Sequence, residues 1–388
     1  MKRLNIGLFI DTFYPMIDGV ITVVDNYAKR LANYANIFVF APKIPNEKYN
    51  DNNFNYTVIR CKSINVFFLD YALPLPDIDK NFKRKIDECN LDIIHIHSPA
   101  PIGKLGIKYA KKNNIPLVAT FHSQYKQDFL RVTKSKTISN ILTKYIISLF
   151  EKCDECWTLN NEIARVFTNE YGYSKTPKII NNATDMLPSK NISKSKERIN
   201  KIHNIKENEF VLLFVGRINR LKNIDLIINS LSKLNIDNYK MLFVGTGQDE
   251  EYLKKQINNK KLTNKVILCG KIIDRELLKD YYVRADLFLF PSLYDTNSLV
   301  QIEAASQKTP TLFVEGAVTA AKVKDNETGF FAKNNPDDYA KKIEEIIKDK
   351  KKYNEVCDNA FENLYIHWDD EVKNIYELYL KLKESRDK

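Results

Sequence analysis

Short apolar segments alternate with helix-like segments along nearly the whole of this sequence. Residues 4–10, 91–97 and 210–215 are apolar, strand-like runs, and each is followed by a loop and a stretch with apolar residues at helical spacing. Alternation of this kind is typical of parallel sheets flanked by helices. The pattern therefore predicts an α/β fold.

The length of the chain and the order of these segments predict two domains. A chain of 388 residues is long enough for two domains of ordinary size, each with its own core. The first series of strands ends near Asp185, and a second series starts at Phe210. Residues 190–208 are charged and polar, so we expect them to hold the linker, and a long final helix is predicted from Trp368.

The composition is that of a globular protein in a reducing compartment. Hydrophobic residues make up 44% of the chain, and no apolar stretch approaches the ~20 residues that a membrane span needs. The six cysteines are scattered, and the lone C-x-x-C at Cys153 and Cys156 has no partner pair for zinc. The net charge of +11 fits an anionic lipid surface or an anionic substrate. No zinc-finger, RNP-like or helix-turn-helix pattern is present, so we expect no nucleic-acid partner.

The segment 287–310 carries the clearest sign of a ligand site. A short apolar strand leads into a Pro-Ser turn with Asp295, and then into a helix that contains Glu303. The free N–H groups at the start of such a helix suit a diphosphate or a sugar hydroxyl. The two carboxylates lie roughly 12 Å apart along the helix axis at ~1.5 Å per residue, which suits one extended ligand better than one metal ion. The alternative is a capping Asp and a surface Glu.

A second candidate site follows the first strand of the second domain. Gly216 permits close backbone approach, and Arg217 and Lys222 flank a turn that leads to a helix. Two cations beside the N–H groups of a helix start form a cradle for a pyrophosphate. Basic residues that simply face solvent in a surface loop are the alternative.

The first domain offers a glycine and a histidine. Gly19 opens a helix after a strand and a loop, but the segment does not match G-x-G-x-x-G, so a dinucleotide site is not indicated. His122 stands just past the end of a predicted parallel strand, where side chains point into the ligand crevice, and His97 has a similar position. Asp77-Ile78-Asp79 has the form of a metal-binding D-x-D but precedes a helix, where Asp is an ordinary cap.

Two segments of the first domain suggest contact with lipid. Residues 123–152 form a basic, amphipathic segment, and residues 66–75 are unusually apolar for a connection. One interpretation is that the helix packs on the sheet with its lysines in solvent. The other is that its cations contact an anionic bilayer while its apolar residues insert into the bilayer surface.

Taken in order, these motifs resemble a family 4 glycosyltransferase of the GT-B fold. The resemblance covers nearly the whole chain and rests on FIDTFYPMIDGV, HIHSP, ATFH, NATD, FVGRINRLKN, FVGTG and PSLYDTNSLVQIEAA. It implies two Rossmann-like domains facing across a cleft, with a C-terminal helix that crosses back to the N-terminal domain. The expected division is an acceptor-binding domain at 1–190, a nucleotide-sugar-binding domain at 191–366 and the returning helix at 367–388.

The resemblance also implies roles for individual residues. Arg217 and Lys222 would neutralise the donor diphosphate in place of a metal, and His122 would contact the donor sugar near the reacting carbon. Asp295 would touch the sugar hydroxyls and Glu303 the ribose hydroxyls. The remaining donor-binding residues would be Gly19, Gly216, Gly270, Lys271, Ile272, Asn297, Ser298 and Leu299.

Three departures from the family pattern stand out. The usual NG-x-D is Asn182-Ala183-Thr184-Asp185, the usual paired glycine is Asp18-Gly19, and the usual first Glu is Asp295. The last is one methylene shorter, which bears on the identity of the sugar.

We therefore predict a retaining, metal-independent hexosyltransferase that uses a nucleotide sugar, with a UDP-hexose favoured, and a lipid or growing polysaccharide as acceptor. No cofactor is expected, because the nucleotide sugar is a substrate. A cytoplasmic protein is expected, peripheral on the inner face of the cell membrane if residues 123–152 bind lipid. The alternatives are a nucleotide-sugar epimerase of the same fold and a non-catalytic protein that binds nucleotide sugars. A nicotinamide oxidoreductase is disfavoured, because both domains lack the glycine fingerprint.

Overall fold

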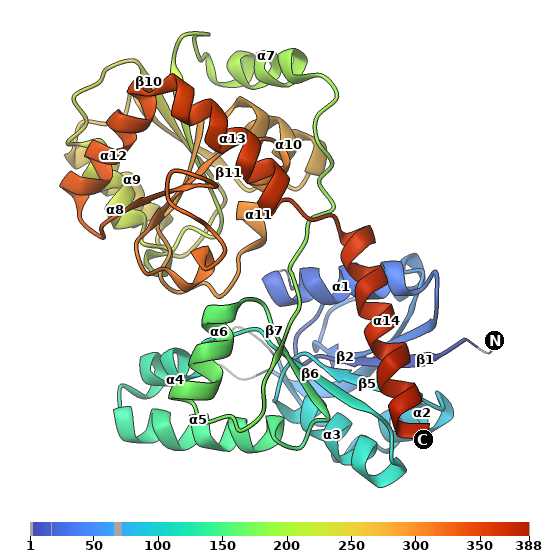
Figure 1. Cartoon of the computed structure of the whole chain (residues 1–388). Helices are drawn as coiled ribbons and strands as arrows, with labels where there is room; N and C mark the ends of the chain where they lie inside the picture. The colour runs from blue at the N-terminus through green and yellow to red at the C-terminus, as the bar shows by residue number, and fades with distance from the viewer. Residues whose placement is uncertain (1–2, 17, 66–71, 388) are drawn as a thin grey trace. The chain divides into compact units, whose positions relative to one another are not determined.

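The chain folds into two compact α/β units. The computed structural model describes residues 3–16, 18–65 and 72–387. The first unit comprises residues 1–181 and 368–388, and the second comprises residues 182–367 (Figure 1). Part of the apolar connection 66–75, namely residues 66–71, lies outside the described residues. The predicted α/β class with two Rossmann-like sheets is confirmed.

The first unit is built on an eight-stranded sheet, counted over the described residues, in the order β4-β3-β2-β1-β5-β6-β7-β8. All pairings are parallel except that between β3 and β4 at one edge. The strands are β1 (Asn5–Phe9), β2 (Asn36–Lys43), β3 (Thr57–Ile64), β4 (Leu73–Pro74), β5 (Ile93–Ile96), β6 (Leu117–Phe121), β7 (Glu155–Thr158) and β8 (Lys178–Ile179). The short edge strand β4 was not predicted from the sequence.

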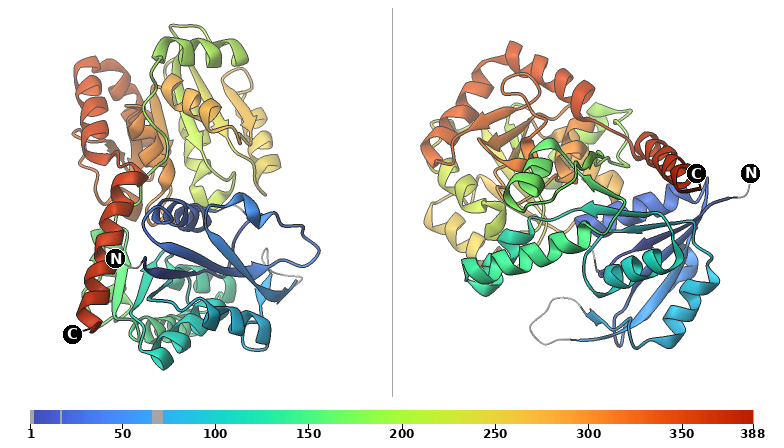
Figure 2. Two further views of the ribbon diagram at one scale, coloured as in Figure 1. Left: turned by 90° about the vertical axis from the view of Figure 1, so that its right-hand side faces the viewer. Right: turned by 60° about the horizontal axis from the view of Figure 1, so that its bottom comes forward.

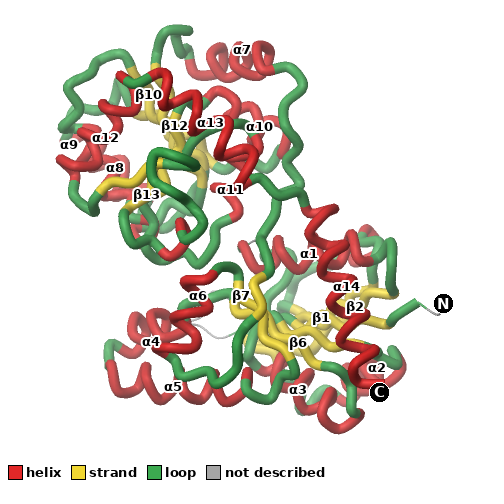
Figure 3. Tube along the Cα trace, in the orientation of Figure 1, coloured by secondary structure: helices red, strands yellow, loops and turns green. Residues whose placement is uncertain are grey.

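Helices follow the strands of the first unit, as the alternating pattern predicts. They are α1 (Gly19–Leu31), α2 (Lys80–Glu88), α3 (Pro101–Asn113), α4 (Tyr125–Thr133), α5 (Lys136–Phe150), α6 (Asn161–Arg165), the helical turns η1 (Asp51–Asn53) and η2 (Val166–Glu170), and α14 (Trp368–Asp387). Strands lie at the centre and helices outside (Figure 3). Helix α2 starts at the cap Asp79, whose carboxylate accepts the Phe82 N–H at 3.1 Å, as expected for a cap.

The final helix α14 belongs to the first unit, although it follows the whole second unit in sequence. It packs across α1, to which it is adjacent in Figure 2. One stripe of α14 is buried at helical spacing, formed by Trp368, Val372, Ile375 and Tyr379. The Tyr379 hydroxyl lies 2.6 Å from Nδ1 of His95 on β5, so the helix is joined to the centre of the sheet by a buried polar contact.

The second unit has a six-stranded, wholly parallel sheet, counted over the described residues, in the order β11-β10-β9-β12-β13-β14. In sequence order this is 3-2-1-4-5-6, the arrangement of a Rossmann fold. The strands are β9 (Phe210–Val215), β10 (Tyr239–Val244), β11 (Val266–Gly270), β12 (Leu287–Phe290), β13 (Thr311–Val314) and β14 (Phe330–Ala332). The sequence analysis placed β9 and β12.

The helices of the second unit cover both faces of this sheet, where two separate apolar clusters form the core. They are α7 (Ile192–His203), α8 (Ile224–Leu231), α9 (Glu250–Asn259), α10 (Arg275–Arg284), α11 (Leu299–Ser306), α12 (Pro336–Lys348), α13 (Lys350–Leu364), and the 3₁₀ turns η3 (Arg220–Lys222) and η4 (Val318–Ala320). One expectation was wrong. The segment 190–208 is not only a linker, because it contains α7, whose buried Ile199 packs into the core.

The contact between Tyr379 and His95 can be tested by mutation. We expect Tyr379→Phe to destabilise the first unit by about 1–3 kcal/mol, because it removes the partner of a buried ring nitrogen. Trp157 and Trp368, the two tryptophans of the chain, both lie in the first unit, so tryptophan fluorescence in urea reports on that unit. Tyr376→Phe is the control. Tyr376 lies on the same helix, but its hydroxyl makes only an exposed contact of 3.5 Å with Tyr34 O. Equal stability of the two variants would contradict the prediction.

Candidate active site

The strand order of the second unit reverses between β9 and β12, and this is where its charged residues gather. In open parallel sheets, ligands bind at the carboxyl ends of the strands at this switch point. The loop after β9 carries Gly216, Arg217 and Lys222, and the loop after β12 carries Asp295. The structure thus brings together residues that stand more than seventy positions apart in sequence.

The loops after β9, β10 and β11 are held together by backbone contacts that need glycine. Gly216 N–H donates to Val244 O, and Gly245 N–H donates to Gly270 O at 2.8 Å. Gly245 has a φ of +136°, and a Cβ placed on it would lie 1.9 Å from Gly216 O. A Cβ on Gly247 would lie 2.2 Å from Ile218 O. Gly245 and Gly247, which the sequence analysis did not single out, thus allow the close contacts between these loops beside the switch point.

Arg217 and Lys222 differ in their surroundings. The Arg217 side chain is exposed, and within the described ranges it makes no hydrogen bond or ion pair. Lys222 ends the turn η3, which Asn219 caps by accepting the Lys222 N–H, and its ammonium group forms a close ion pair with Oδ1 of Asp295. Arg217 is therefore available to an anion, whereas Lys222 has a carboxylate partner before any ligand arrives.

Asp295 has one oxygen in use and one without a partner. Its Oδ2 is buried and accepts no hydrogen bond from any part of the chain that the structure describes. A buried carboxylate oxygen left unpaired is costly, and such atoms usually have a partner or a function. This orphaned acceptor fits the hydroxyl group of a ligand.

The start of α11 lies directly after Asp295 in the chain. Asn297 O accepts the Nδ2–H of Asn182, which joins the NATD segment to this loop at 2.8 Å. The N–H of Ser298, expected to meet the ligand, instead donates to Thr319 Oγ1 at 3.2 Å. Leu299 is the first residue of the helix, so its N–H has no acceptor within the helix.

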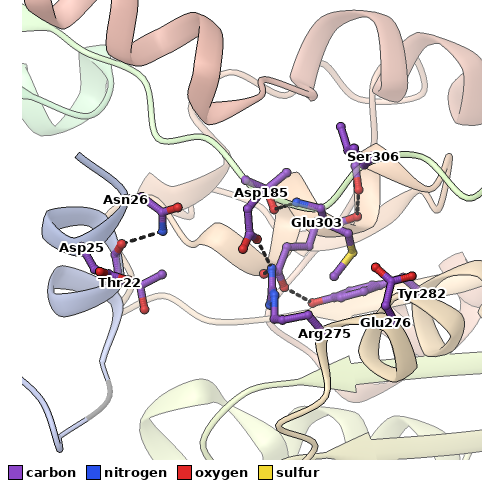
Figure 4. A network of polar contacts seen from close by, with 12 residues as sticks. Thr22, Asp25, Asn26, Asp185, Arg275, Glu276, Tyr282, Glu303 and Ser306 are labelled. Atoms are coloured by element: carbon purple, nitrogen blue, oxygen red, sulfur yellow. Dashed lines mark hydrogen bonds and ion pairs between the residues drawn. The ribbon is translucent and has the colours of Figure 1, made fainter. Parts of the chain in front are cut away.

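Glu303 on α11 is buried, with 6% of the residue exposed, and both of its oxygens are in contact with other side chains. Oε2 accepts the Tyr282 hydroxyl at 2.8 Å, and Oε1 lies 2.8 Å from Nη2 of Arg275. The same nitrogen of Arg275 donates to Asp185 (Figure 4). The alternative of a surface Glu is thereby wrong, and the sequence analysis did not find Arg275 or Tyr282.

Gly270, Lys271 and Ile272 follow β11, next to the interlocked glycine loops. Gly270 has a φ of +70° and accepts the Gly245 N–H, whereas Lys271 is exposed and Ile272 is partly buried. Their expected contact with the base stays a prediction.

In the first unit, Gly19 is the first residue of α1, which Asp18 caps by accepting the Ile21 N–H at 2.8 Å. A Cβ on Gly19 would meet nothing within 4 Å. The fold of the unit therefore does not require glycine here, and the open space in front of it is compatible with the close approach of a ligand.

His122 follows β6 and belongs to a row of buried histidines. Its Nε2 lies 3.1 Å from Nδ1 of His97, which follows the neighbouring strand β5, and His95 packs on His97 with ring centroids 4.0 Å apart. Burial lowers the pKa of His122 to about 3, and burial and the neighbouring rings lower the pKa values of His95 and His97 well below 6.5. All three rings are neutral at pH 7.

Asp11, which the sequence analysis did not single out, is held at the switch point of the first sheet. It follows β1 and accepts the N–H groups of Ile102 and Gly103 at the start of α3, and the Ser98 hydroxyl at 2.6 Å. Burial raises its pKa to about 6 against these hydrogen bonds. A carboxylate directly after a strand was the available signal. Asp11 fills the anion position at this helix start with a side chain.

The helix pair α4–α5 presents apolar and basic side chains to solvent together. Leu130, Val132, Ile138, Ile141 and Tyr145 are exposed, with Val132 at 76% and Ile141 at 61%. Lys134, Lys136 and Lys144 are exposed among them. The opposite face of α5 is buried on the unit. The helix thus packs on its unit, and it also carries an exposed apolar surface. We call these eight residues the α4–α5 surface.

Within the parts of the chain that are described, no three His, Cys, Asp or Glu residues are grouped so as to hold a metal. Asp77 forms an exposed ion pair with Lys108, and Asp79 is the α2 cap. In the same described ranges, no helix has the length and apolar character needed to span a membrane.

The fold and the family models together define a class of enzyme. Two Rossmann-like units of this kind form the GT-B fold, which a solved structure shares over nearly the whole chain. The family model Glycosyltransferase Family 4 matches residues 17–186, and the model Glycosyl transferases group 1 matches residues 195–363. The chain belongs to this glycosyltransferase family and is a glycosyltransferase.

Curated relatives include two enzymes of glycolipid synthesis. The chain is 28% identical to the alpha-monoglucosyldiacylglycerol synthase of Acholeplasma laidlawii, over 89% of this chain and 87% of the relative. It is 26% identical to the enzyme of the same name from Streptococcus pneumoniae, over 80% and 70%.

Solved structures show the same fold at low identity. The sucrose-phosphate synthase of Thermosynechococcus elongatus superposes with a TM-score of 0.84 at 20% identity, over 99% of this chain and all of that chain. Anabaena HepE in complex with UDP and glucose gives a TM-score of 0.77 at 16% identity, over 97% and 99%.

The histidine row makes the first unit sensitive to acid. Since the pKa of His122 falls from 6.5 to about 3 on folding, the unfolded chain binds more protons between these values, and stability is lost as the pH falls below 6.5. His95 and His97 act in the same direction, while Asp11, with its raised pKa, acts in the opposite one. Each histidine contributes up to about 1.4 kcal/mol per pH unit.

We therefore expect the free energy of unfolding of the first unit, followed by tryptophan fluorescence, to decrease from pH 6.5 to 4.5. His122→Asn should make this slope shallower, whereas His203→Asn in the second unit should not. A wild-type slope of zero or of opposite sign would contradict the prediction.

Proposed function

We propose that this glycosyltransferase moves a hexose from UDP-hexose to a lipid acceptor, with retention at the anomeric carbon and without a metal. The observation that carries the proposal is the switch-point arrangement of the second unit. There Lys222 is paired with Asp295, Oδ2 of Asp295 has no partner in the described chain, and Arg217 is exposed nearby in the same loop as Lys222.

The cations account for the leaving group. As the sugar departs, negative charge develops on the diphosphate, and preorganised donors aimed at that charge lower the barrier. An ammonium group has three N–H donors, so Lys222 can bind a phosphate oxygen while it keeps Asp295. Arg217 and the Leu299 N–H at the start of α11 supply further donors. These groups take the place of a metal ion.

Asp295 is assigned to sugar recognition rather than to nucleophilic attack. Its Oδ1 is neutralised by Lys222, which weakens it as a nucleophile, and its unpaired Oδ2 can accept a sugar hydroxyl. Retention then follows from attack of the acceptor on the same face as the leaving group, with the leaving phosphate taking the acceptor proton. His122 is neutral and is assigned to contact with the donor sugar, and His97 orients its ring.

Two observations favour a UDP donor and a lipid acceptor. A structure of the same fold, HepE, holds UDP and glucose, and the two curated relatives are named for the synthesis of a glucosyl lipid. The α4–α5 surface adds a physical reason, because apolar side chains interleaved with lysines suit an anionic bilayer. The acceptor would then be taken from the membrane on which the enzyme rests.

The donor and acceptor can be tested together by measuring release of nucleoside diphosphate from a panel of nucleotide sugars, with and without membrane lipid. We expect release from UDP-hexose that depends on the lipid. Conversion of the donor without acceptor would instead indicate an epimerase, and donor binding without any release would indicate a binding protein. Either result would reject the proposal.

The role of the cations is tested by Arg217→Ala and Lys222→Ala. We expect each to lower kcat by about 100-fold or more, because each removes a donor to the developing charge. Arg220→Ala is a matched control, since Arg220 lies in the same turn but pairs with Asp225. Thermal unfolding verifies that the variants are folded. Unchanged kcat in both variants would remove the basis for metal-independent transfer.

The membrane contact is tested with the double variant Val132→Gln and Ile141→Gln. We expect wild type to float with vesicles that contain anionic lipid, and the variant to float about tenfold less, because its apolar anchor is lost. Ile192→Gln serves as control, because Ile192 is an exposed apolar residue, at 56%, on α7 of the second unit. Equal flotation of the double variant and wild type would exclude the α4–α5 surface as the contact.

A further inference from the structure

The carboxylate of Glu303 is held from two directions by side chains that the proposed function does not use. Tyr282 on α10 donates its hydroxyl to Oε2 at 2.8 Å, and Arg275 at the start of α10 places Nη2 2.8 Å from Oε1. Figure 4 shows both pointing at Glu303, and the Arg275 guanidinium also contacts Asp185. One helix therefore supplies both contacts to the carboxylate.

The two contacts differ in rigidity. Tyr282 is fully buried, and its ring packs edge-on against Phe288 of β12 with centroids 5.7 Å apart. Burial and the charge of Glu303 raise the pKa of the Tyr282 hydroxyl well above 10, so it remains a donor at any working pH. The Arg275 side chain is 45% exposed and is shared with Asp185. Tyr282 is thus a fixed anchor, and Arg275 is a contact at the rim.

The number of hydrogen bonds defines what Glu303 can still accept. An ionised carboxylate offers about four acceptor positions on its two oxygens. Tyr282 and Arg275 take one position on each oxygen, which leaves one on each. Two donors at neighbouring positions, such as the two hydroxyls of a vicinal diol, match this remaining pair.

We propose that Tyr282 and Arg275 are positioning residues that orient Glu303 to recognise the 2′,3′-diol of the donor ribose, and so select ribonucleotides over deoxyribonucleotides. This inference rests on the proposed function and on the contact between Glu303 and the donor ribose that the family resemblance implies. Loss of the Tyr282 hydroxyl lets the carboxylate turn away from the orientation in which both of its oxygens can accept the diol. Selection for the diol then falls even though Glu303 is still present.

The test is equilibrium binding of UDP, 2′-deoxy-UDP and 3′-deoxy-UDP, measured by calorimetry, together with steady-state kinetics on UDP-hexose. For wild type we expect UDP to bind at least tenfold more tightly than either deoxy form. Tyr282→Phe should weaken UDP binding about tenfold, leave binding of the deoxy forms nearly unchanged, and raise KM while kcat stays within about twofold. Glu303→Gln should likewise abolish the selection.

A matched control separates this role from general destabilisation. Tyr339 is also fully buried in the second unit, and its hydroxyl donates to Leu312 O at 3.0 Å. Tyr339→Phe should lower the thermal stability as Tyr282→Phe does, yet keep the selection for UDP. Equal loss of selection in both variants would overturn the proposal, since the effect would then be structural.

Arg275 provides an independent test. Arg275→Ala should weaken UDP binding three- to tenfold, and Arg275→Lys should restore only part of it, because an ammonium group cannot reproduce the planar fork. Arg198→Ala is the control. Arg198 and Arg275 both line a cavity of about 600 Å³ beside α7 and α10, but Arg198 pairs with Asp280. Tighter UDP binding by Arg275→Ala would overturn the proposal, since Arg275 would then compete with the ligand.

The outcomes distinguish this inference from the function on which it rests. If wild type binds UDP and transfers sugar but treats the deoxy forms equally, the positioning role is wrong and the proposed function stands. If wild type binds no uridine nucleotide, both are wrong.

Discussion

The ion pair between Lys222 and Asp295 is the interaction on which the second unit's site depends. It joins the two loops that leave the sheet where the strand order reverses, and each loop is fixed by a different means. The β9 loop is held by backbone contacts with the neighbouring glycine loops, and the β12 loop is held through Asn297 by Asn182. Because both loops are anchored, the Lys222–Asp295 pair is held with little exposure to solvent, and Oδ2 of Asp295 has no partner in the described chain.

Both sheets have a switch point where the strand order reverses, and the two switch points are occupied differently. In the first, the acceptor at the switch point is Asp11, whose oxygens are all directed at the start of α3, so the helix end is already neutralised by the protein. In the second, the cation Arg217 is exposed and an oxygen of Asp295 is unpaired in the described chain. One switch point is closed by its own side chain and the other is open to a ligand, which supports our proposal that the nucleotide binds to the second unit.

Much of this architecture was predictable because it follows from local patterns. Alternating apolar strands and amphipathic helices predicted the parallel sheets, and Asp79 was predicted as a cap from its place before a helix. The short strands β4 and β14 were missed because two or three residues carry no period. The helix α7 was missed because its face is mostly polar, and only Ser195 and Ile199 are buried. In the sequence, the many charged residues of this segment indicated a linker, and two buried positions were too few to indicate a helix.

The candidate site was predictable where a residue's neighbours in sequence are also its neighbours in space. Gly216, Arg217 and Lys222 lie in one loop, and Asp295 precedes one helix. The contacts of Glu303 with Tyr282 and Arg275 could not be predicted, since they join residues about twenty to thirty positions apart on two helices whose packing the sequence does not specify. The same holds for Asp11, which caps a helix ninety residues further on.

The return of α14 to the first unit makes the second unit an insertion within the first. The chain leaves the first unit after Asn181, whose N–H donates to Glu371 of α14, and re-enters it at Trp368. During synthesis, residues 368–387 emerge only after the whole of the second unit. Until then Tyr27, His95 and Trp157 lack the helix that covers them. The domain that is made first is thus the last to be completed, and the inserted domain, being continuous in sequence, can fold while the other waits.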